Sequence, residues 1–177
     1  YAIPGSVVAV RILIPFAWLD NAINTWLHTH YDTIIGLVFS GTAFILIYAY
    51  VVRFLAVSFN AVEASLGKVT PSMDAASRTL GQTAGGTLRR IHTPLMRSSL
   101  LAAGILVFVD VMKELPATII LRPFNFDTLA VRAHSLASDE RLAEASTASL
   151  TIVVVGILPV ILLSLAMRRA RPGSQAE

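Results

Sequence analysis

Long apolar runs separated by short polar stretches dominate the chain. Residues 34–52 carry no charged side chain, and residues 145–167 form a second uncharged run that contains Pro159. A helix of about 20 residues crosses a hydrocarbon core of about 30 Å. Transmembrane helices also tolerate an internal proline better than soluble helices do. Both runs are therefore predicted to cross a membrane.

Two further runs are weaker candidates for membrane spans. Residues 3–19 are long enough but carry Arg11 near the middle, and residues 98–109 reach spanning length only by continuing through charged positions up to Glu114. With both included, the pattern predicts an all-α membrane protein. Its four spans are expected at about residues 3–19, 33–56, 97–115 and 145–167, with a polar loop over residues 60–94 and another over residues 116–144.

The basic residues predict how these spans are oriented, because loops rich in Lys and Arg stay in the cytoplasm. The first connecting segment, from Asn21 to Thr33, has none. The segment from Arg53 to Arg97 has six, and the tail after Met167 has three. The 60–94 loop and the C-terminus are therefore expected to be cytoplasmic, and residues 116–144 are expected to lie outside.

Composition agrees with a membrane location and excludes other classes of protein. Only 14% of the residues are charged and 55% are hydrophobic, whereas soluble proteins carry about 25% charged residues. The net charge of +3 comes from residues between apolar runs, not from one basic face, so nucleic-acid binding is not indicated. The lack of cysteine excludes thiolate metal sites, and the four histidines show no zinc-ligand spacing.

The 60–94 loop has helical signals of its own. Thr70 followed by Pro71 is typical of a helix start. Residues 73–80 suit a short helix that Gly81 would end, and residues 88–91 can begin a second short helix before Pro94 interrupts. The alternative is an ordinary basic loop held at the lipid headgroups.

The spacing within this loop resembles the EAA loop of ABC importer permeases, in which Glu-Ala-Ala is followed by Gly and then by Ile-x-Leu-Pro. The matching positions are Asp74, Ala75, Ala76, Gly81, Ile91 and Pro94. Asp74 replaces the glutamate, and Thr93 stands where leucine is usual. The resemblance implies that the first short helix sits in a cleft of an ATPase subunit and transmits ATP-driven closure to the spans.

The residue types suit that role. Ala75 and Ala76 permit close approach to a partner, and Gly81 allows a turn with positive φ. Asp74 complements the helix dipole and could pair with a basic residue of the partner. The chain contains no GxxxxGK[ST] motif. ATP and Mg²⁺ are therefore expected on a separate ATPase chain, with no catalytic residue and no cofactor on this one.

Outside the loop the sequence is similar to ferric-iron ABC permeases. The similar segments are residues 1–5, 50–54, 109–118, 121–130 and 138–145. This resemblance implies a type I permease bundle in a bacterial inner membrane, forming the C-terminal half of a longer, internally duplicated permease. The implied partners are the missing N-terminal half, an ATPase dimer, a solute-binding protein and membrane lipid.

Other interpretations stay open at this point. Within transport, the substrate could instead be sulfate, thiamine, a polyamine or a phosphonate. From another class, an intramembrane enzyme would use Asp110, Glu114 and His134 as acid and base groups and would turn over without nucleotide. A membrane scaffold would show no solute uptake.

Ionisable groups near the outer face are candidates for a substrate pathway. Asp110, Lys113 and Glu114 have the i, i+3, i+4 spacing of a shared helical face, and charges at membrane depth line a pathway or pair with one another. One hypothesis has Asp110 and Glu114 lining a route for ferric ion, with Lys113 or Arg122 receiving an anion. The alternative is a structural ion-pair cluster. Arg11 either pairs with Asp110 or snorkels to the interface.

Overall fold

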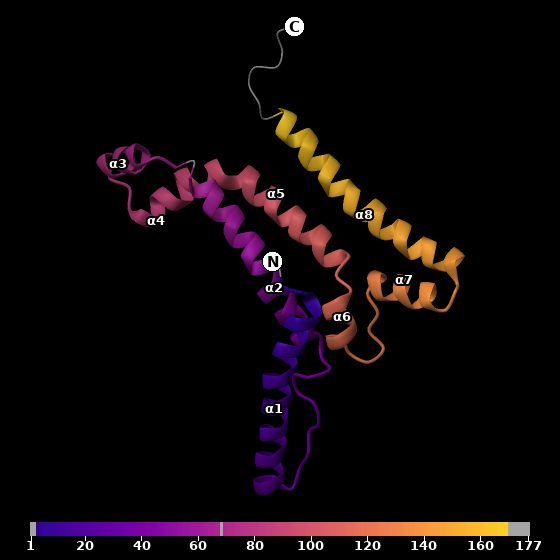
Figure 1. Cartoon of the computed structure of the whole chain (residues 1–177). Helices are drawn as coiled ribbons and strands as arrows, with labels where there is room; N and C mark the ends of the chain where they lie inside the picture. The colour runs from indigo at the N-terminus through magenta and orange to yellow at the C-terminus, as the bar shows by residue number, and fades with distance from the viewer. Residues whose placement is uncertain (1–2, 68, 170–177) are drawn as a thin grey trace. The chain divides into compact units, whose positions relative to one another are not determined.

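A computed structural model describes residues 3–67 and 69–169 (Figure 1). Two of the basic residues that were used to predict the orientation, Lys68 and Arg171, lie outside the described residues, as do the first two residues. The described part is helical and contains no strand. Its elements are α1 (Gly5–Tyr31), α2 (Ala43–Leu66), α3 (Pro71–Thr79), α4 (Ala84–Thr87), the π-helical turn η1 (Leu88–His92), α5 (Thr93–Met112), α6 (Pro116–Leu121), α7 (Leu129–Ser138) and α8 (Leu142–Arg169).

Four helical stretches of the described chain are long and apolar enough to cross a membrane. They are Gly5–Tyr31, Ala43–Leu66, Ala84–Met112 and Leu142–Leu162. The prediction of an all-α protein with four membrane-length helices is therefore confirmed, although the bounds of the helices differ from the expected spans.

The chain divides into two compact units. The first comprises Tyr1–Leu55 and Asp110–Val155, and the second comprises Ala56–Val109 and Gly156–Glu177. The candidate pathway residues belong to the first unit, and the residues that resemble the EAA loop belong to the second.

The core of the first unit is built from small and branched apolar side chains of three helices. Its buried members are Ala9 and Ile12 of α1, Ile45, Leu46 and Ala49 of α2, and Ala117 and Leu121 of α6. Small side chains let helix backbones approach closely, which drives helix association in lipid. Many other large apolar side chains are exposed, such as Ile14 and Ile47, as expected for surfaces that face lipid.

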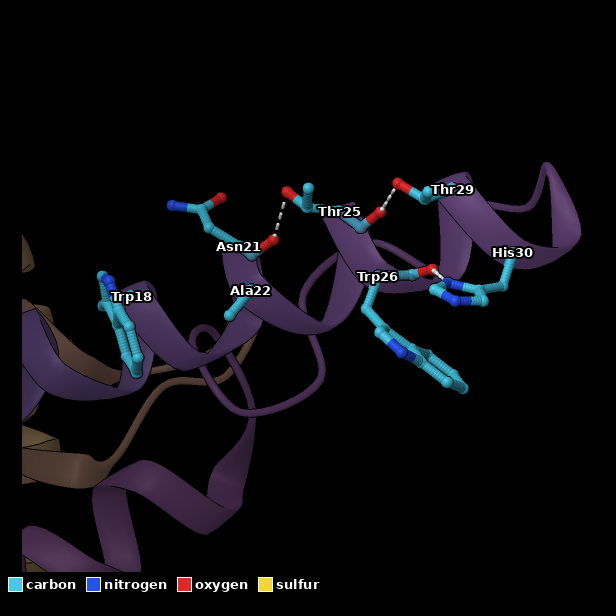
Figure 2. Close-up of a pocket in the computed structure, with 7 residues that line it drawn as sticks. All are labelled: Trp18, Asn21, Ala22, Thr25, Trp26, Thr29 and His30. Atoms are coloured by element: carbon cyan, nitrogen blue, oxygen red, sulfur yellow. Dashed lines mark hydrogen bonds between the residues drawn. The ribbon is translucent and has the colours of Figure 1, made fainter.

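Helix α1 is longer than the sequence pattern suggested. Residues 21–30, expected as a polar loop, continue the helix to Tyr31. Their polar side chains bond within the helix: the Thr25 hydroxyl donates to the Asn21 carbonyl (2.9 Å), and the Thr29 hydroxyl donates to the Thr25 carbonyl (2.8 Å). Figure 2 shows these groups along one side of α1, where they line an open pocket together with Trp18 and Trp26. The change from apolar to polar residues at Asn21 therefore does not coincide with the end of α1.

Helix α2 begins later than expected. The second span was predicted from residue 33, but residues 33–42, here called the strap, are not helical and α2 begins at Ala43. Gly36 and Gly41 have φ angles of 76° and 77°. Glycine adopts this left-handed conformation without steric cost. Gly36 and Gly41 thus allow a non-helical backbone in residues whose hydropathy suggested a membrane-spanning helix.

A buried carboxylate of α1 holds the strap in place. The Asp20 side chain is 0% exposed and accepts backbone N–H groups from Val38 (3.1 Å), Phe39 (2.9 Å) and Ser40 (2.7 Å). Irregular backbone at membrane depth needs such internal partners, because lipid offers none. The aromatic ring of Phe39 also packs against Phe16 of α1, with centroids 5.6 Å apart.

One turn further along α1, Asn24 forms a second attachment. Its Oδ1 accepts the N–H groups of Ile35 and Gly36, each at 3.1 Å, and its Nδ2 donates to the Gly36 carbonyl at 2.6 Å. Asp20 and Asn24 are four residues apart and so lie on the same helical face. The strap is therefore held to this face of α1 at two positions, by Asp20 and by Asn24.

The third membrane-length helix also differs from its predicted bounds. The α4, η1 and α5 elements follow one another without a break from Ala84 to Met112. Pro94 was expected to interrupt the chain before this span, but the helical structure continues through it, two residues after the π-helical turn η1. The short helix expected from Leu88 is therefore the start of the long helix.

Candidate functional site

Helix α3 forms as its sequence signals predicted. Thr70 has extended backbone angles and Pro71 occupies the first turn of the helix, which ends at Thr79. Gly81 follows with φ +74°, a conformation in which any side chain would be strained. The Thr70 hydroxyl makes no capping bond to α3 and instead contacts the Ser72 hydroxyl at 2.8 Å. The start of α3 thus depends on Pro71 more than on a side-chain cap.

Two side chains of α3 turn toward the next element of the chain. The Asp74 carboxylate lies 2.7 Å from Nε2 of His92, at the end of η1. The Ser77 hydroxyl lies 2.7 Å from the Thr87 hydroxyl, and both residues are buried. A small cavity of about 130 Å³ lies beside these contacts and is lined by Asp74, Arg78, Ala84, Thr87 and His92.

The remaining residues of the EAA-like pattern lie around this contact. Ala75 and Ala76 are exposed on α3, Ile91 is half-buried in η1, and Pro94 is exposed at the start of α5. His92 is not one of the positions that carry the resemblance to the EAA loop. Its contact with Asp74 spans eighteen residues, and no local motif indicated it.

The charges at the end of α5 do not form one group. Lys113 Nζ lies 2.9 Å from the Asp110 carboxylate, which agrees with the ion-pair alternative for these two residues. Helix α5 ends at Met112, so Glu114 does not share their helical face. Arg11, considered as a partner for Asp110, is exposed on α1.

Glu114 is instead buried against α2. Its Oε2 lies 3.2 Å from Nε of Arg53, and the two side chains are 6% and 18% exposed. Arg53 Nε has no aligned hydrogen-bond acceptor, so the attraction between the two is chiefly an ionic contact. Burying two charges is costly, and the cost is offset only while both partners are present.

The same glutamate organises the start of α6. Its Oε1 accepts the Ala117 N–H at 3.2 Å, and its carbonyl accepts the Thr118 hydroxyl at 2.7 Å. The Thr118 hydroxyl also lies 2.5 Å from the Tyr50 hydroxyl of α2. Glu114 therefore links the first turn of α6 to α2 by charge and by hydrogen bonds.

Gly5 at the start of α1 leaves the space that this ion pair needs. A Cβ at Gly5 would clash with the Glu114 carboxylate and would lie 2.6 Å from Arg53 Nη1. We expect Gly5→Ala to lower the free energy of unfolding by about 1–3 kcal/mol, the usual range for overpacking a core. Denaturant unfolding of the protein in detergent measures this change. Gly104→Ala is the control, because a Cβ there meets no atom within 4 Å; equal effects of the two substitutions would contradict the prediction.

Arg122, proposed to receive an anion, is paired within its own loop. Its guanidinium contacts the Asp127 carboxylate. The loop turns at residues 123–126, where the Phe126 N–H donates to the Pro123 carbonyl at 3.1 Å. Phe124, at the tip of this turn, is 96% exposed. Within the described residues, no three His, Asp or Glu side chains gather as a metal site would require.

Curated proteins similar to this chain are transport permeases. No protein-family model matches the chain. It is 27% identical over 163 residues to the Fe(3+)-transport system permease protein FbpB 2 of Haemophilus influenzae, covering 92% of this chain and 29% of that protein. It is 30% identical over 164 residues to a putative 2-aminoethylphosphonate transport system permease protein PhnV of Salmonella choleraesuis, covering 93% and 55%.

The chain is a homologue of ABC importer permeases. A third relative, the ferric transport system permease protein FbpB of Actinobacillus pleuropneumoniae, is 29% identical over 136 residues, covering 77% of this chain and 17% of that protein. The permease chain described here thus spans less than two thirds of the length of each of these relatives. Together with its four membrane-length helices, the homology makes it a multi-pass inner-membrane protein.

Proposed function

We propose that this chain is a membrane-spanning subunit of an ATP-driven importer and that α3 is the helix on which an ATPase subunit docks. The observation that carries the proposal is the hairpin of α3, Gly81 and α4. In it, α3 follows the membrane-length helix Ala43–Leu66 in the chain, and α4 is the first turn of the next one, Ala84–Met112. Ala75 and Ala76 are exposed on α3, so a partner can approach the helix backbone closely. The homology to transport permeases supports the same function.

The proposal assigns this hairpin and the C-terminus to the cytoplasm, in line with the distribution of Lys and Arg. ATP and Mg²⁺ would bind the ATPase dimer, and this chain would contribute no catalytic group. Its other partners would be a solute-binding protein on the outer side and the N-terminal half of a longer permease.

Ferric iron is the proposed substrate, and 2-aminoethylphosphonate is the second candidate. Relatives named for each of these substrates align with most of this chain. Asp110, Lys113, Glu114 and Arg122 stay proposed pathway residues, although each has an ionic partner within the chain. Uptake of ⁵⁵Fe(III) and of labelled 2-aminoethylphosphonate into proteoliposomes with the assembled transporter distinguishes the two substrates.

Docking of the ATPase is tested by Gly81→Val in the assembled transporter. A β-branched residue at φ +74° is strained by about 1–3 kcal/mol. We expect affinity for the ATPase, and the hydrolysis that depends on it, to fall roughly tenfold. Co-purification of the ATPase and phosphate release measure the effect.

The matched control for this substitution is Gly85→Ala. A Cβ at Gly85 meets no atom within 4 Å, and the residue lies in α4 of the same hairpin. We expect the control to retain ATPase binding. If Gly81→Val binds the ATPase as well as the control does, α3 is not the docking element.

A further inference from the structure

We propose that His92 is a positioning residue that, with Asp74, fastens the docking helix α3 to the membrane-length helix α5. The contacts Asp74–His92 and Ser77–Thr87 are here called the clasp. This inference rests on the proposed function of α3. It adds the contacts through which a displacement of α3 would be transmitted to a membrane-length helix.

The clasp holds α3 at two points. Asp74 and Ser77 are three residues apart and so lie on the same face of α3. Each is 2.7 Å from its partner across the hairpin. One contact alone would let α3 pivot about it, whereas two contacts one helical turn apart fix its direction.

The π-helical turn explains why both partners face α3. Thr87 and His92 are five residues apart, a spacing that in an α-helix of 3.6 residues per turn would place them on different sides. In a π-helix, residues five apart are joined by the backbone hydrogen bond and face the same side. η1 covers this interval, from Leu88 to His92. The π-helical turn thus places Thr87 and His92 on the side that faces α3, in keeping with the frequent occurrence of π-helical turns at functional sites.

Beyond the clasp the backbone runs directly into α5. The Thr93 N–H bonds to the Leu88 carbonyl, and the Thr93 hydroxyl donates to the same carbonyl at 2.9 Å. Helical structure then continues to Met112. A displacement of α3 held by the clasp is therefore passed to the start of α5 without an intervening flexible loop.

The clasp also changes which surface of α3 is free for a partner. Asp74 and Ser77 are engaged within the chain. Ala75 and Ala76 are exposed, and Leu80 is 78% exposed at the end of the helix. A partner therefore meets Ala75, Ala76 and Leu80 beside the exposed Arg78, whereas the Asp74 side chain, although 40% exposed, is held by His92.

The test uses the complete transporter in proteoliposomes and measures solute uptake per ATP hydrolysed. We expect His92→Ala to retain the ATPase on co-purification and to lower uptake per ATP roughly fivefold or more, the usual range of coupling between sites. The exchange Asp74→His with His92→Asp restores an acid beside an imidazole and is expected to regain most of the lost uptake. Arg90→Ala is the control, because the Arg90 guanidinium donates an exposed hydrogen bond to Gln82 (3.2 Å) across the same hairpin and is not part of the clasp.

A second variant tests the joint within one folded protein. The chain has no cysteine, so Ser77→Cys with Thr87→Cys can be introduced into the His92→Ala background and oxidised with copper phenanthroline. We expect low uptake per ATP in the reduced form and recovery when the disulfide forms. No recovery on oxidation, or wild-type coupling in His92→Ala, overturns the clasp. Failure of the wild-type chain to bind any ATPase instead overturns the proposed function.

Discussion

Replacing Glu114 by alanine is expected to lower the free energy of unfolding by about 3–5 kcal/mol, the usual cost of breaking a buried ion pair. The substitution leaves Arg53, of which only 18% is exposed, without its opposing charge. It also removes the acceptor of the Ala117 N–H at the start of α6. Denaturant unfolding of the protein in detergent, followed by tryptophan fluorescence, measures the change.

Two comparisons make this prediction specific to the buried pair. Arg141→Ala removes one member of an ion pair with Glu144 whose side chains are 53% and 54% exposed, so it should cost no more than about 1 kcal/mol. The double variant Arg53→Met with Glu114→Leu removes both charges and should recover much of the lost stability. If Glu114→Ala instead unfolds like the wild type but abolishes uptake, Glu114 acts in the substrate pathway and not in a structural pair.

Replacing Asp20 by alanine is expected to release the strap from α1. Three backbone N–H groups would lose their acceptor, and each unsatisfied buried donor costs about 1–3 kcal/mol. Of the three bonds, only the one from the Ser40 N–H is fully buried. Because Asn24 still holds residues 35 and 36, we expect local opening with a loss of roughly 1–3 kcal/mol. In the cysteine-free chain, Ser40→Cys supplies one label site, because Ser40 is only 6% exposed, and its rate of alkylation should rise strongly in the Asp20→Ala background.

The control for Asp20 is the other aspartate of the same region. Asp32 lies at the end of α1 with a side chain that is 94% exposed, 3.6 Å from His28. Asp32→Asn keeps a residue that tolerates the left-handed backbone there and should leave the labelling rate unchanged. Equal labelling of Ser40→Cys in the wild-type, Asp20→Ala and Asp32→Asn backgrounds would show that the carboxylate of Asp20 does not hold the strap.

Local signals in the sequence were sufficient for α3. Proline at the first turn and glycine after the last turn act through the conformation of one residue each, so Pro71 and Gly81 could be recognised without knowing the fold. The membrane-length helices were predicted for a similar reason, because their apolar content follows from the solvent that surrounds them.

The strap and the Arg53–Glu114 ion pair could not be predicted in this way. Asp20 acts on residues eighteen to twenty positions away, and hydropathy alone made residues 34–52 resemble a continuous helix. The Glu114 partner, Arg53, lies on a different helix, whereas the i, i+3, i+4 spacing had grouped Glu114 with Asp110 and Lys113. Pro116 is a local signal that the helix ends nearby, because a proline removes one backbone N–H donor from a helix, but it does not place that end before Glu114.

The length of α1 has a consequence for the bilayer around it. Twenty-seven residues at 1.5 Å each extend about 40 Å, which exceeds a hydrocarbon thickness of about 30 Å. An upright α1 would place its final two turns among the headgroups, with the stacked rings of Trp26 and His30 (4.8 Å between centroids) at the depth where indoles gather. In a thicker bilayer, the hydrocarbon core would extend over these final turns of α1. In a thin bilayer, tilting of α1 would likewise bring these turns into the hydrocarbon core. Lipid chain length is therefore a variable that acts directly on the end of α1 from which the strap departs.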